Sequence, residues 1–338
     1  PERAFAAAAG RRTSTMRAWM CRRYGGPETL TLETVPQPRP KPGEVLIRVV
    51  ATSVSSGDVR VRALRVPAGM KTMARLALGF TGPRRRVLGT ELSGVIAAVG
   101  GRVTAFKPGD AVIAFPGVAM GAHAEYRVMP ADGRIALKPE SMSFAEGAAL
   151  CFGGSTALHF LRRAGLKQGE RMLVIGASGA VGSAMVQLAR QQGAWVAGVA
   201  STANLDLVRS LNADAAIDYT RGAYLGTGET YDVIADAVGI THFSGCHASL
   251  NEHGRYLSLA GGLGDMMARP KGTKRSIAGP AAERKEDVAE LVQLAAAGAF
   301  RPVIDSIVPF EALPDAHRRA DSGRKRGSVV VEVSAACR

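Results

Sequence analysis

A glycine-rich turn between a buried strand and a helix is the feature that most constrains this fold. The apolar run 172–175 leads into Gly176, Gly179 and Gly182, and a helical pattern follows over 180–192. This GxxGxxG spacing is a variant of the GxGxxG dinucleotide fingerprint, and it has the preceding strand and following helix that the fingerprint requires. Glycine permits the tight turn and lets the backbone approach a pyrophosphate, which the helix N-terminus attracts. The motif predicts a dinucleotide site formed by Gly176, Ala177, Ser178, Gly179, Ala180, Val181 and Gly182; the alternative is a strand–helix turn without a ligand.

Strands and helices alternate on both sides of this turn. We expect strands at 171–176, 195–200, 214–218, 231–235 and 254–260, and helices at 143–151, 154–164, 180–192, 203–211 and 241–250. Such alternation predicts an α/β fold with a parallel, doubly wound Rossmann sheet. A Gly- and Lys-rich loop is expected over 261–283, followed by a helix at 284–297 and a last strand at 328–334.

The N-terminal part has a different pattern. Residues 17–50 and 87–140 alternate in the manner of strands and predict a compact β-rich domain. Between them, the segment 58–86 mixes Leu and Met with Arg and Lys. This segment is interpreted as a basic amphipathic helix over the active site or as a surface insertion, with a membrane-surface role as a third interpretation.

Size and charge exclude several classes of protein. A chain of 338 residues with 46% hydrophobic content is long enough for two domains, and its apolar runs are too short to span a membrane. The net charge of +14 is spread along the chain without a nucleic-acid-binding motif, so no nucleic-acid partner is expected. Four widely spaced cysteines predict a reduced, cytoplasmic protein. Residues 1–15 are interpreted as a disordered N-terminal extension or a targeting remnant.

The strand after the glycine turn bears on the choice of cofactor. NAD enzymes place a carboxylate about 20 residues past the motif, where it binds the ribose hydroxyls. Here the strand 195–200 ends in Ser201, Thr202, Ala203 and Asn204 without a carboxylate, and Tyr219 adds a hydroxyl after the next strand. Hydroxyls and an amide favour a 2′-phosphate, so NADP(H) is predicted. No basic residue occupies 201–204, and Arg209 or Arg221 would have to supply the positive charge.

Together these residues resemble the medium-chain dehydrogenase/reductase superfamily, on its zinc-independent quinone oxidoreductase-like branch. The resemblance extends from Met16 to Val333. Besides the turn at 176–182, it rests on RYGGPE at 23–28, KPGEVL at 41–46, GTELSG at 89–94, FKPGD at 106–110, LVRSLNAD at 207–214 and GRKRG at 323–327.

The resemblance implies an arrangement of domains. A GroES-like catalytic domain would comprise residues 16–140 and 284–338, and a Rossmann NADP(H)-binding domain would be inserted at 141–283. The cofactor would lie in the cleft between them. By analogy with the family, a homodimer would form through the edge of the Rossmann sheet.

The resemblance also implies that the chain holds no metal. Zinc-containing relatives place a cysteine at the position of Ser55, a histidine at that of Thr90 and a third ligand near Phe152. Hydroxyls are poor zinc ligands beside thiolate and imidazole, and phenylalanine is none. His242, Cys246 and His247 are close in sequence, but we expect them on a surface helix and predict no metal there.

The zinc-free branch implies an NADPH-dependent reductase that delivers hydride to a quinone or an α,β-unsaturated carbonyl. The pocket candidates, all from positions that match the family's cleft, are Ser55, Asp58, Thr90 and Phe152, with turn bonding or core packing as the alternative for each. The matching nicotinamide contacts are Thr156, Val238, Gly239, Ala260 and Gly261. Two other functions stay open: a zinc-free alcohol dehydrogenase or biosynthetic enoyl reductase, and a non-catalytic NADPH-binding sensor or membrane-surface protein.

Overall fold

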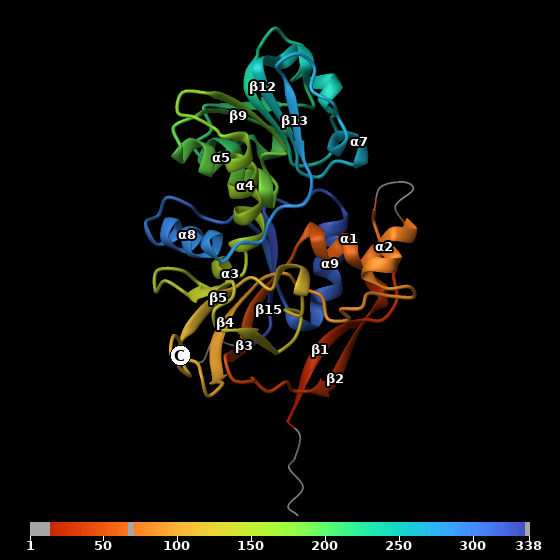
Figure 1. The fold of residues 1–338 in the computed structure, drawn as a ribbon, viewed down its shortest axis with the longest axis vertical. Helices are drawn as coiled ribbons and strands as arrows, with labels where there is room; N and C mark the ends of the chain where they lie inside the picture. Colours follow the sequence, from red (N-terminus) through yellow and green to blue (C-terminus); the bar gives the residue numbers. More distant parts are fainter. Residues whose placement is uncertain (1–13, 67–70, 335–338) are drawn as a thin grey trace, which may run out of the picture.

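The computed structural model describes residues 14–66 and 71–334. Two sheets lie one above the other along the long axis of the molecule (Figure 1). Thr15 already belongs to the first strand, one residue before the predicted start at Met16. The rest of the predicted N-terminal extension, residues 1–13, lies outside the described residues.

The six-stranded sheet carries the glycine turn, and its strands follow the order β10-β9-β8-β11-β12-β13, all in parallel. Its strands are β8 (Arg171–Ile175), β9 (Trp195–Ala200), β10 (Ala215–Asp218), β11 (Tyr231–Asp236), β12 (Leu250–Ser258) and β13 (Arg275–Ala278). The connecting segments are α4 (Cys151–Ala164), α5 (Ala180–Gln191), η3 (Thr202–Asn204), α6 (Leu205–Ser210), η4 (Phe243–Ser249) and α7 (Leu263–Met266). The chain reverses its winding between β8 and β11, and ligands of such sheets bind at this switch point. The predicted doubly wound sheet is confirmed.

The second sheet has seven strands in the order β14-β15-β3-β4-β5-β7, with β6 also paired to β3. Its strands are β3 (Glu44–Val54), β4 (Leu92–Val99), β5 (Ala111–Ala114), β6 (Tyr126–Pro130), β7 (Ile135–Leu137), β14 (Ile304–Pro309) and β15 (Ser328–Glu332). A separate antiparallel pair joins β1 (Thr15–Cys21) to β2 (Leu30–Pro36). The helical segments around these sheets are η1 (Pro27–Thr29), α1 (Ser56–Ala63), α2 (Lys71–Leu78), η2 (Gly117–Ala119), α3 (Phe144–Gly147), α8 (Lys285–Ala296), η5 (Phe310–Ala312) and α9 (Leu313–Asp321).

Three predictions about secondary structure need correction. The expected helix at 241–250 is a 3-10 segment, η4, which leads directly into β12. The expected loop at 261–283 contains the short helix α7 and the sixth strand, β13, which forms because its backbone pairs with β12. The expected helix at 143–151 is the single turn α3, and α4 begins at Cys151.

The C-terminal part contributes more to the second sheet than the sequence pattern indicated. Strand β15 pairs with β3, so residues 328–332 lie inside the same sheet as the N-terminal strands β3 to β7. Strand β14 pairs in parallel with β15, and α9 connects the two. This return of the chain brings the loop after α9 beside the glycine turn.

Candidate functional site

A cavity of about 1400 Å³ lies between the two sheets, at the carboxyl ends of β8, β9, β11 and β12. Helices α1 and α4 line it on the other side, together with residues 115–120, 279–283 and 323–326. Sites for one small ligand usually enclose about 300–1,000 Å³. This cavity therefore has room for a dinucleotide and a second molecule.

The glycine turn forms one wall of the cavity, and its backbone geometry requires glycine. Gly176 has φ +79°, in the left-handed region. A Cβ on Gly182 would lie 2.0 Å from the carbonyl oxygen of Gly176, so strand and helix approach too closely for a side chain. Gly179 precedes α5, and no side chain caps the helix there. The first N–H groups of α5 are therefore available to an anion in the cavity.

Six of the seven turn residues predicted from the sequence line the cavity. These are Gly176, Ser178, Gly179, Ala180, Val181 and Gly182. Ala177 instead lies in the core, where its methyl group supports the turn from behind.

Three of the four residues predicted to hold a 2′-phosphate also line the cavity: Ser201, Asn204 and Tyr219. The Asn204 side-chain amide donates to Ser178 Oγ over 3.2 Å and to Ser201 Oγ over 3.3 Å, which links the end of β9 to the glycine turn. The fourth, Thr202, is absent from the lining. Its hydroxyl donates to the Asp218 carboxylate over 2.6 Å.

The two arginines expected to supply positive charge pair with carboxylates instead. Arg209 lies 2.7 Å from Asp206, and Arg221 lies 3.4 Å from Asp218. Neither side chain lines the cavity. The expectation that one of them supplies the charge of the site is not supported by this geometry.

A basic loop that the residue-by-residue prediction missed lies against the turn. The Gly327 N–H donates to the Ser178 carbonyl over 2.8 Å, and Gly327 forms an isolated bridge with Gly179. Arg324, Lys325 and Arg326, just before this contact, line the cavity. Within the described ranges, the guanidinium groups of both arginines are exposed and form no hydrogen bond or ion pair. The available signal was the run of three basic residues between Gly323 and Gly327.

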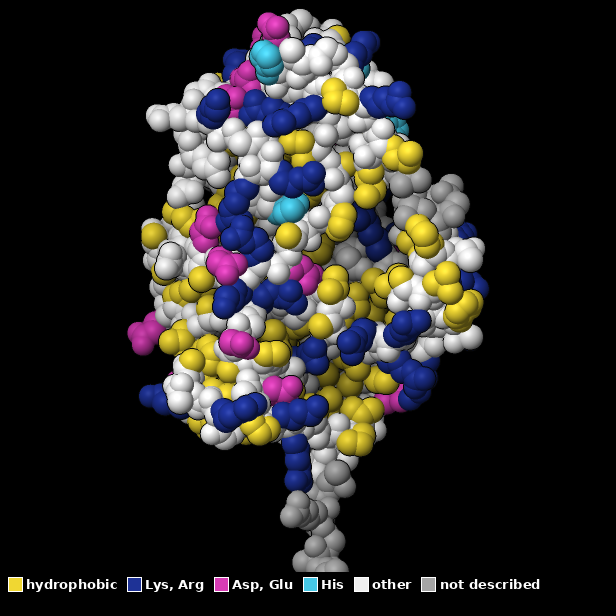
Figure 2. Space-filling view, in the orientation of Figure 1, with side chains coloured by type: hydrophobic (Ala, Val, Ile, Leu, Met, Phe, Trp, Pro, Cys, Tyr) yellow, Lys and Arg dark blue, Asp and Glu magenta, His cyan; other side chains and the backbone are white. Residues whose placement is uncertain are grey.

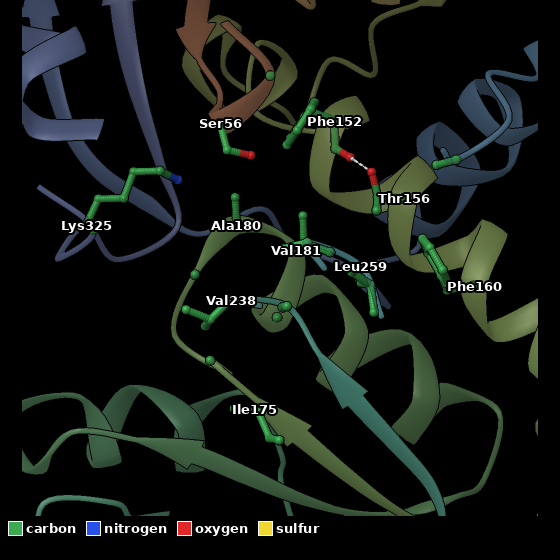
Figure 3. Close-up of a pocket in the computed structure, with 18 of the residues that line it drawn as sticks. Ser56, Phe152, Thr156, Phe160, Ile175, Ala180, Val181, Val238, Leu259 and Lys325 are labelled. Carbon is green, nitrogen blue, oxygen red and sulfur yellow. Dashed lines mark hydrogen bonds between the residues drawn. The ribbon is translucent and has the colours of Figure 1, made fainter. Parts of the chain in front are cut away.

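Lys325 is the one member of this loop that is half-buried. Its side chain reaches into the cavity with Ser56 and Ala180 ahead of its Nζ (Figure 3). The Nζ donates to the Gly327 carbonyl over 2.5 Å. Burial lowers the pKa of this ammonium to about 8, although Asp305 and Glu91 favour its charged form.

Four of the five predicted nicotinamide contacts line the cavity. Thr156 on α4, Val238 after β11, and Ala260 and Gly261 after β12 all line the cavity, whereas Gly239 is not part of the lining.

Asp236, at the carboxyl end of β11, organises the loop that carries Val238. Its buried carboxylate accepts from the N–H groups of Val238, Gly239, Ile240 and Thr241 at 2.7–2.9 Å, and from the Thr241 hydroxyl. Nothing in the sequence distinguished Asp236 from any other polar residue at the end of a strand. Its role is to hold the wall in place, because every hydrogen bond that its carboxylate accepts comes from its own loop.

The four pocket candidates fall into two groups. Thr90 and Phe152 line the cavity, whereas Ser55 and Asp58 are buried behind it. Thr90 Oγ1 donates to Ser55 Oγ over 3.2 Å, and Ser55 Oγ donates to the Asp58 carboxylate over 2.6 Å. Asp58 also accepts from the N–H groups of Ser55 and Gly89, both over 2.8 Å. Asp58 thus caps α1 and fixes the loop before Thr90, which agrees with turn bonding, the alternative interpretation of this residue.

Glu91 holds the other side of the same wall. Its carboxylate accepts from the N–H groups of Cys151 and Phe152 at 2.9 and 2.8 Å, and from the Ser53 hydroxyl. Burial raises the pKa of this carboxyl to about 7, against the opposing effect of these hydrogen bonds. Glu91 therefore fixes the N-terminus of α4 and with it the position of Phe152.

The part of the cavity next to Thr90 combines aromatic rings with the hydroxyl of Ser56. Phe115 and Phe152 line it, and Gly57 lies against the Phe152 ring, since a Cβ there would be 3.3 Å from that ring. Ser56 lies beside Phe152 in Figure 3. In the described part of the chain, the Ser56 hydroxyl has no hydrogen-bond partner. Nothing in the sequence pattern favours Ser56 over its neighbour Ser55.

Residues 14–66 and 71–334 contain no cluster of three His, Cys, Asp or Glu side chains that could hold a metal ion. In the segment considered earlier, Cys246 is buried, and the His247 ring packs edge-on against Phe243. Burial raises the pKa of the Cys246 thiol to about 11, which disfavours a thiolate ligand there. Cys246 therefore does not face the surface, contrary to the expectation of a surface helix.

Comparison with known proteins adds two family matches. Residues 41–140 match the model of the alcohol dehydrogenase GroES-like domain, and residues 211–331 match the model named zinc-binding dehydrogenase.

Similar proteins extend along nearly the whole chain. A 2-methylene-furan-3-one reductase of Solanum lycopersicum is 32% identical, over 94% of this chain and 79% of its own length. An NADPH-dependent alkenal/one oxidoreductase of Arabidopsis thaliana, a chloroplastic protein, is 31% identical with the same coverage. Among solved structures, the quinone oxidoreductase from Coxiella burnetii superposes with a TM-score of 0.81 at 26% identity, covering 95% of this chain and 100% of its own.

Proposed function

This chain belongs to the medium-chain dehydrogenase/reductase superfamily, and from that premise we propose that it reduces a quinone or an α,β-unsaturated carbonyl with NADPH and without zinc. It is an oxidoreductase, and its relatives in the comparison are enone and quinone reductases. The moderate identity to these relatives leaves the acceptor defined as a chemical class.

The observation that carries this proposal is the continuity of the cavity. The glycine turn and the free N–H groups of α5 lie at one end, and Thr90, Ser56 and Phe152 lie at the other. A dinucleotide whose pyrophosphate lies at α5 would extend its nicotinamide along Thr156 and Val238 toward the aromatic part. An acceptor between these side chains would then meet the nicotinamide face.

NADP(H) rather than NAD(H) is supported by the charges around the end of β9. Arg324 and Arg326 line the same cavity as Ser201 and Asn204, and the contact between Gly327 and Ser178 holds the basic loop there. Asp206, the first carboxylate after β9, is paired with Arg209 on the surface. Free guanidinium groups beside hydroxyl and amide donors fit a 2′-phosphate.

Zinc does not fit the residues at the position that the family would use. The side chains there are the hydroxyls of Ser55 and Thr90, which bond to each other, and the ring of Phe152. Structural and catalytic zinc sites are made of thiolate, imidazole and carboxylate ligands. Although one family model bears the name zinc-binding dehydrogenase, the donors in this chain do not match a zinc site.

The protein's part is to position the acceptor, to exclude water from it and to donate hydrogen bonds to its oxygen. NADPH, when bound, supplies the hydride. Phe115 and Phe152 give the acceptor an apolar surface and keep water from it. The Ser56 hydroxyl donates to the acceptor oxygen as negative charge develops there, and Thr90 lies where a second hydroxyl would do the same once its bond to Ser55 rotates. The final proton comes from water at the open end of the cavity.

A panel assay tests the proposal. The full chain should consume NADPH with quinones and enones and show no alcohol oxidation with NADP⁺. NADPH binding without turnover on any acceptor would replace the proposal with the non-catalytic sensor. Preferential alcohol oxidation would replace it with the zinc-free alcohol dehydrogenase.

The pH dependence of cofactor binding should follow Lys325. Because the pKa of Lys325 is about 8, its positive charge is present below that pH and lost above it. Cofactor phosphates are fully ionised above pH 7, so the KM for NADPH should rise about tenfold between about pH 7 and about pH 10. Lys325→Met should have a high KM with little pH dependence, and Lys325→Arg should keep a low KM at high pH. A wild-type KM that stays constant over this range would argue against a contact between Lys325 and phosphate.

Other features remain proposals with structural support. The strands of the six-stranded sheet all lie within residues 171–278, and those of the seven-stranded sheet lie within 44–137 and 304–332, which supports domains at 141–283 and at 16–140 with 284–338. Buried free thiols at Cys21, Cys151 and Cys246 support a reducing compartment such as the cytoplasm. The edge strand β13 offers a surface for a homodimer.

A further inference from the structure

Helix α2 buries none of its residues, although it carries apolar side chains. Met73, Leu76 and Phe80 follow one another at intervals of three and four residues and are exposed by 61%, 54% and 61%. On α2 this spacing places Met73 and Leu76 on one face, and the exposed Phe80 follows just beyond the end of the helix. Helices as short as eight residues are marginal in water unless an apolar face packs on something. The face of α2 packs on nothing within the described part of the chain.

The segment around α2 is basic throughout. Between Asp58 and Glu91 the sequence has no acidic residue but has eight Arg and Lys residues. Lys71 and Arg75 lie on α2, on the side opposite Met73 and Leu76, and the exposed Arg84, Arg85 and Arg86 follow. An apolar face with basic side chains beside and behind it is typical of helices that lie in the interface of an anionic membrane.

The rest of the segment fixes α2 at the surface of the protein. The Tyr24 hydroxyl donates to the Gly79 carbonyl over 2.8 Å, and the Arg84 guanidinium donates to the Leu76 carbonyl over 2.8 Å. These bonds attach the end of α2 to the region of β1 and leave its apolar face turned outward. Figure 2 shows yellow apolar side chains over α2 with dark blue Lys and Arg side chains around them.

We propose that the α2 face, formed by Met73, Leu76 and Phe80 with Lys71, Arg75 and Arg84–Arg86 around it, docks this protein on the surface of an anionic lipid bilayer. The apolar side chains enter the boundary between headgroups and acyl chains, and the basic side chains contact the lipid phosphates. The absence of acidic residues favours lipid over a protein partner, whose surfaces mix both signs of charge. No helix in residues 14–66 and 71–334 is long and apolar enough to cross a bilayer, so the contact is peripheral.

The α2 face lies on the same side of the molecule as α1 and α7, which border the cavity (Figure 1). Met266 on α7, which is in the cavity lining, is also apolar and exposed, by 49%. Docking would therefore turn the open side of the cavity toward the lipid. The docking itself does not depend on the reaction proposed above, and binding is measured separately from turnover.

The test is sedimentation of the full chain with vesicles of phosphatidylcholine, with or without phosphatidylglycerol. Binding is expected only with the anionic lipid, and it should weaken as salt rises. Leu76→Glu with Phe80→Glu, and separately Lys71→Glu with Arg75→Glu, should each weaken binding about tenfold or more. NADPH binding should stay unchanged in both variants, which shows that they are folded.

Two controls separate docking from general attraction of a basic protein to anionic vesicles. Arg39→Glu with Lys41→Glu changes the net charge by as much as Lys71→Glu with Arg75→Glu does, at two exposed residues before β3. Leu137→Glu is the control for Leu76→Glu with Phe80→Glu, because it places a charge at another exposed apolar residue, on β7. Both controls should bind as the unmodified protein does. Equal losses in controls and α2 variants, or no vesicle binding at low salt, would overturn the proposal. Self-association that only the α2 variants abolish, without vesicle binding, would also overturn it and identify the face as an interface between copies of this chain.

Discussion

Replacing Gly182 with alanine should lower both the stability of the protein and its affinity for NADPH. The new Cβ would lie 2.0 Å from the Gly176 carbonyl oxygen and 2.8 Å from its carbonyl carbon, and neither backbone atom can move without displacing the turn. Overpacking of this kind costs about 3 kcal/mol in the free energy of unfolding. Because the displaced helix start would lose its charge-assisted bonds to the pyrophosphate, we expect the dissociation constant for NADPH to rise about a hundredfold.

Gly179→Ala is the matched control in the same turn. Gly179 has φ −79°, and a Cβ there would have only an ordinary contact of 3.5 Å with the Gly176 oxygen. The free energy of unfolding should stay unchanged, while NADPH binding should weaken about tenfold because the methyl group projects into the cavity. Chemical denaturation and cofactor titration of both variants measure the two effects. If Gly182→Ala leaves both quantities unchanged, the turn is not the pyrophosphate site.

Removing the two free guanidinium groups of the basic loop should abolish the preference for NADPH. In Arg324→Ala with Arg326→Ala, the KM for NADPH should rise about a hundredfold, because each charge-assisted bond to phosphate contributes about 1.5–3 kcal/mol. The KM for NADH should change little, since NADH has no 2′-phosphate. Steady-state kinetics with both cofactors at one salt concentration measure this.

The matched control for that variant removes the same net charge elsewhere. Arg39→Ala with Lys41→Ala changes two exposed side chains far from the cavity lining. It should leave both KM values as they are. A fall in NADH affinity equal to that in NADPH affinity would place the arginines on the pyrophosphate instead of the 2′-phosphate.

The sequence predicted the parts of the site that depend on neighbouring residues. The turn at 176–182 was predictable because a strand, three glycines and a helix follow one another directly in the sequence. The end of β9, with Ser201 and Asn204, was predictable because parallel strands bring their carboxyl ends to one edge. Both predictions use local order and the general geometry of doubly wound sheets.

The missing parts depend on contacts between distant segments. Arg324 and Arg326 reach the turn only because β15 pairs with β3 and leaves Gly327 against Ser178. Thr202 looked available from the sequence, but Asp218 lies within hydrogen-bond distance of it in the folded chain. Strand β13 lies in a Gly- and Lys-rich stretch without alternation, and it forms through pairing with β12.

The pocket candidates show the same limit. A resemblance in sequence assigned Ser55, Asp58, Thr90 and Phe152 to one cleft, and the structure brings all four together. The resemblance cannot tell which side chains line the cavity and which support its wall, because that depends on the direction in which each side chain points. Ser56, next to the buried Ser55, places its side chain in the cavity lining, whereas the Asp58 carboxylate is occupied by Ser55 and Gly89.

Transfer of deuterium from deuterated NADPH to an enone, by protein treated with a chelator and measured for zinc, shows whether the protein delivers hydride without a metal. We expect the deuterium on the electron-poor carbon of the enone, one per NADPH consumed, at a rate independent of zinc content. A rate that falls with zinc removal and returns when zinc is added, or NADPH that binds without transferring its deuterium, would contradict this expectation.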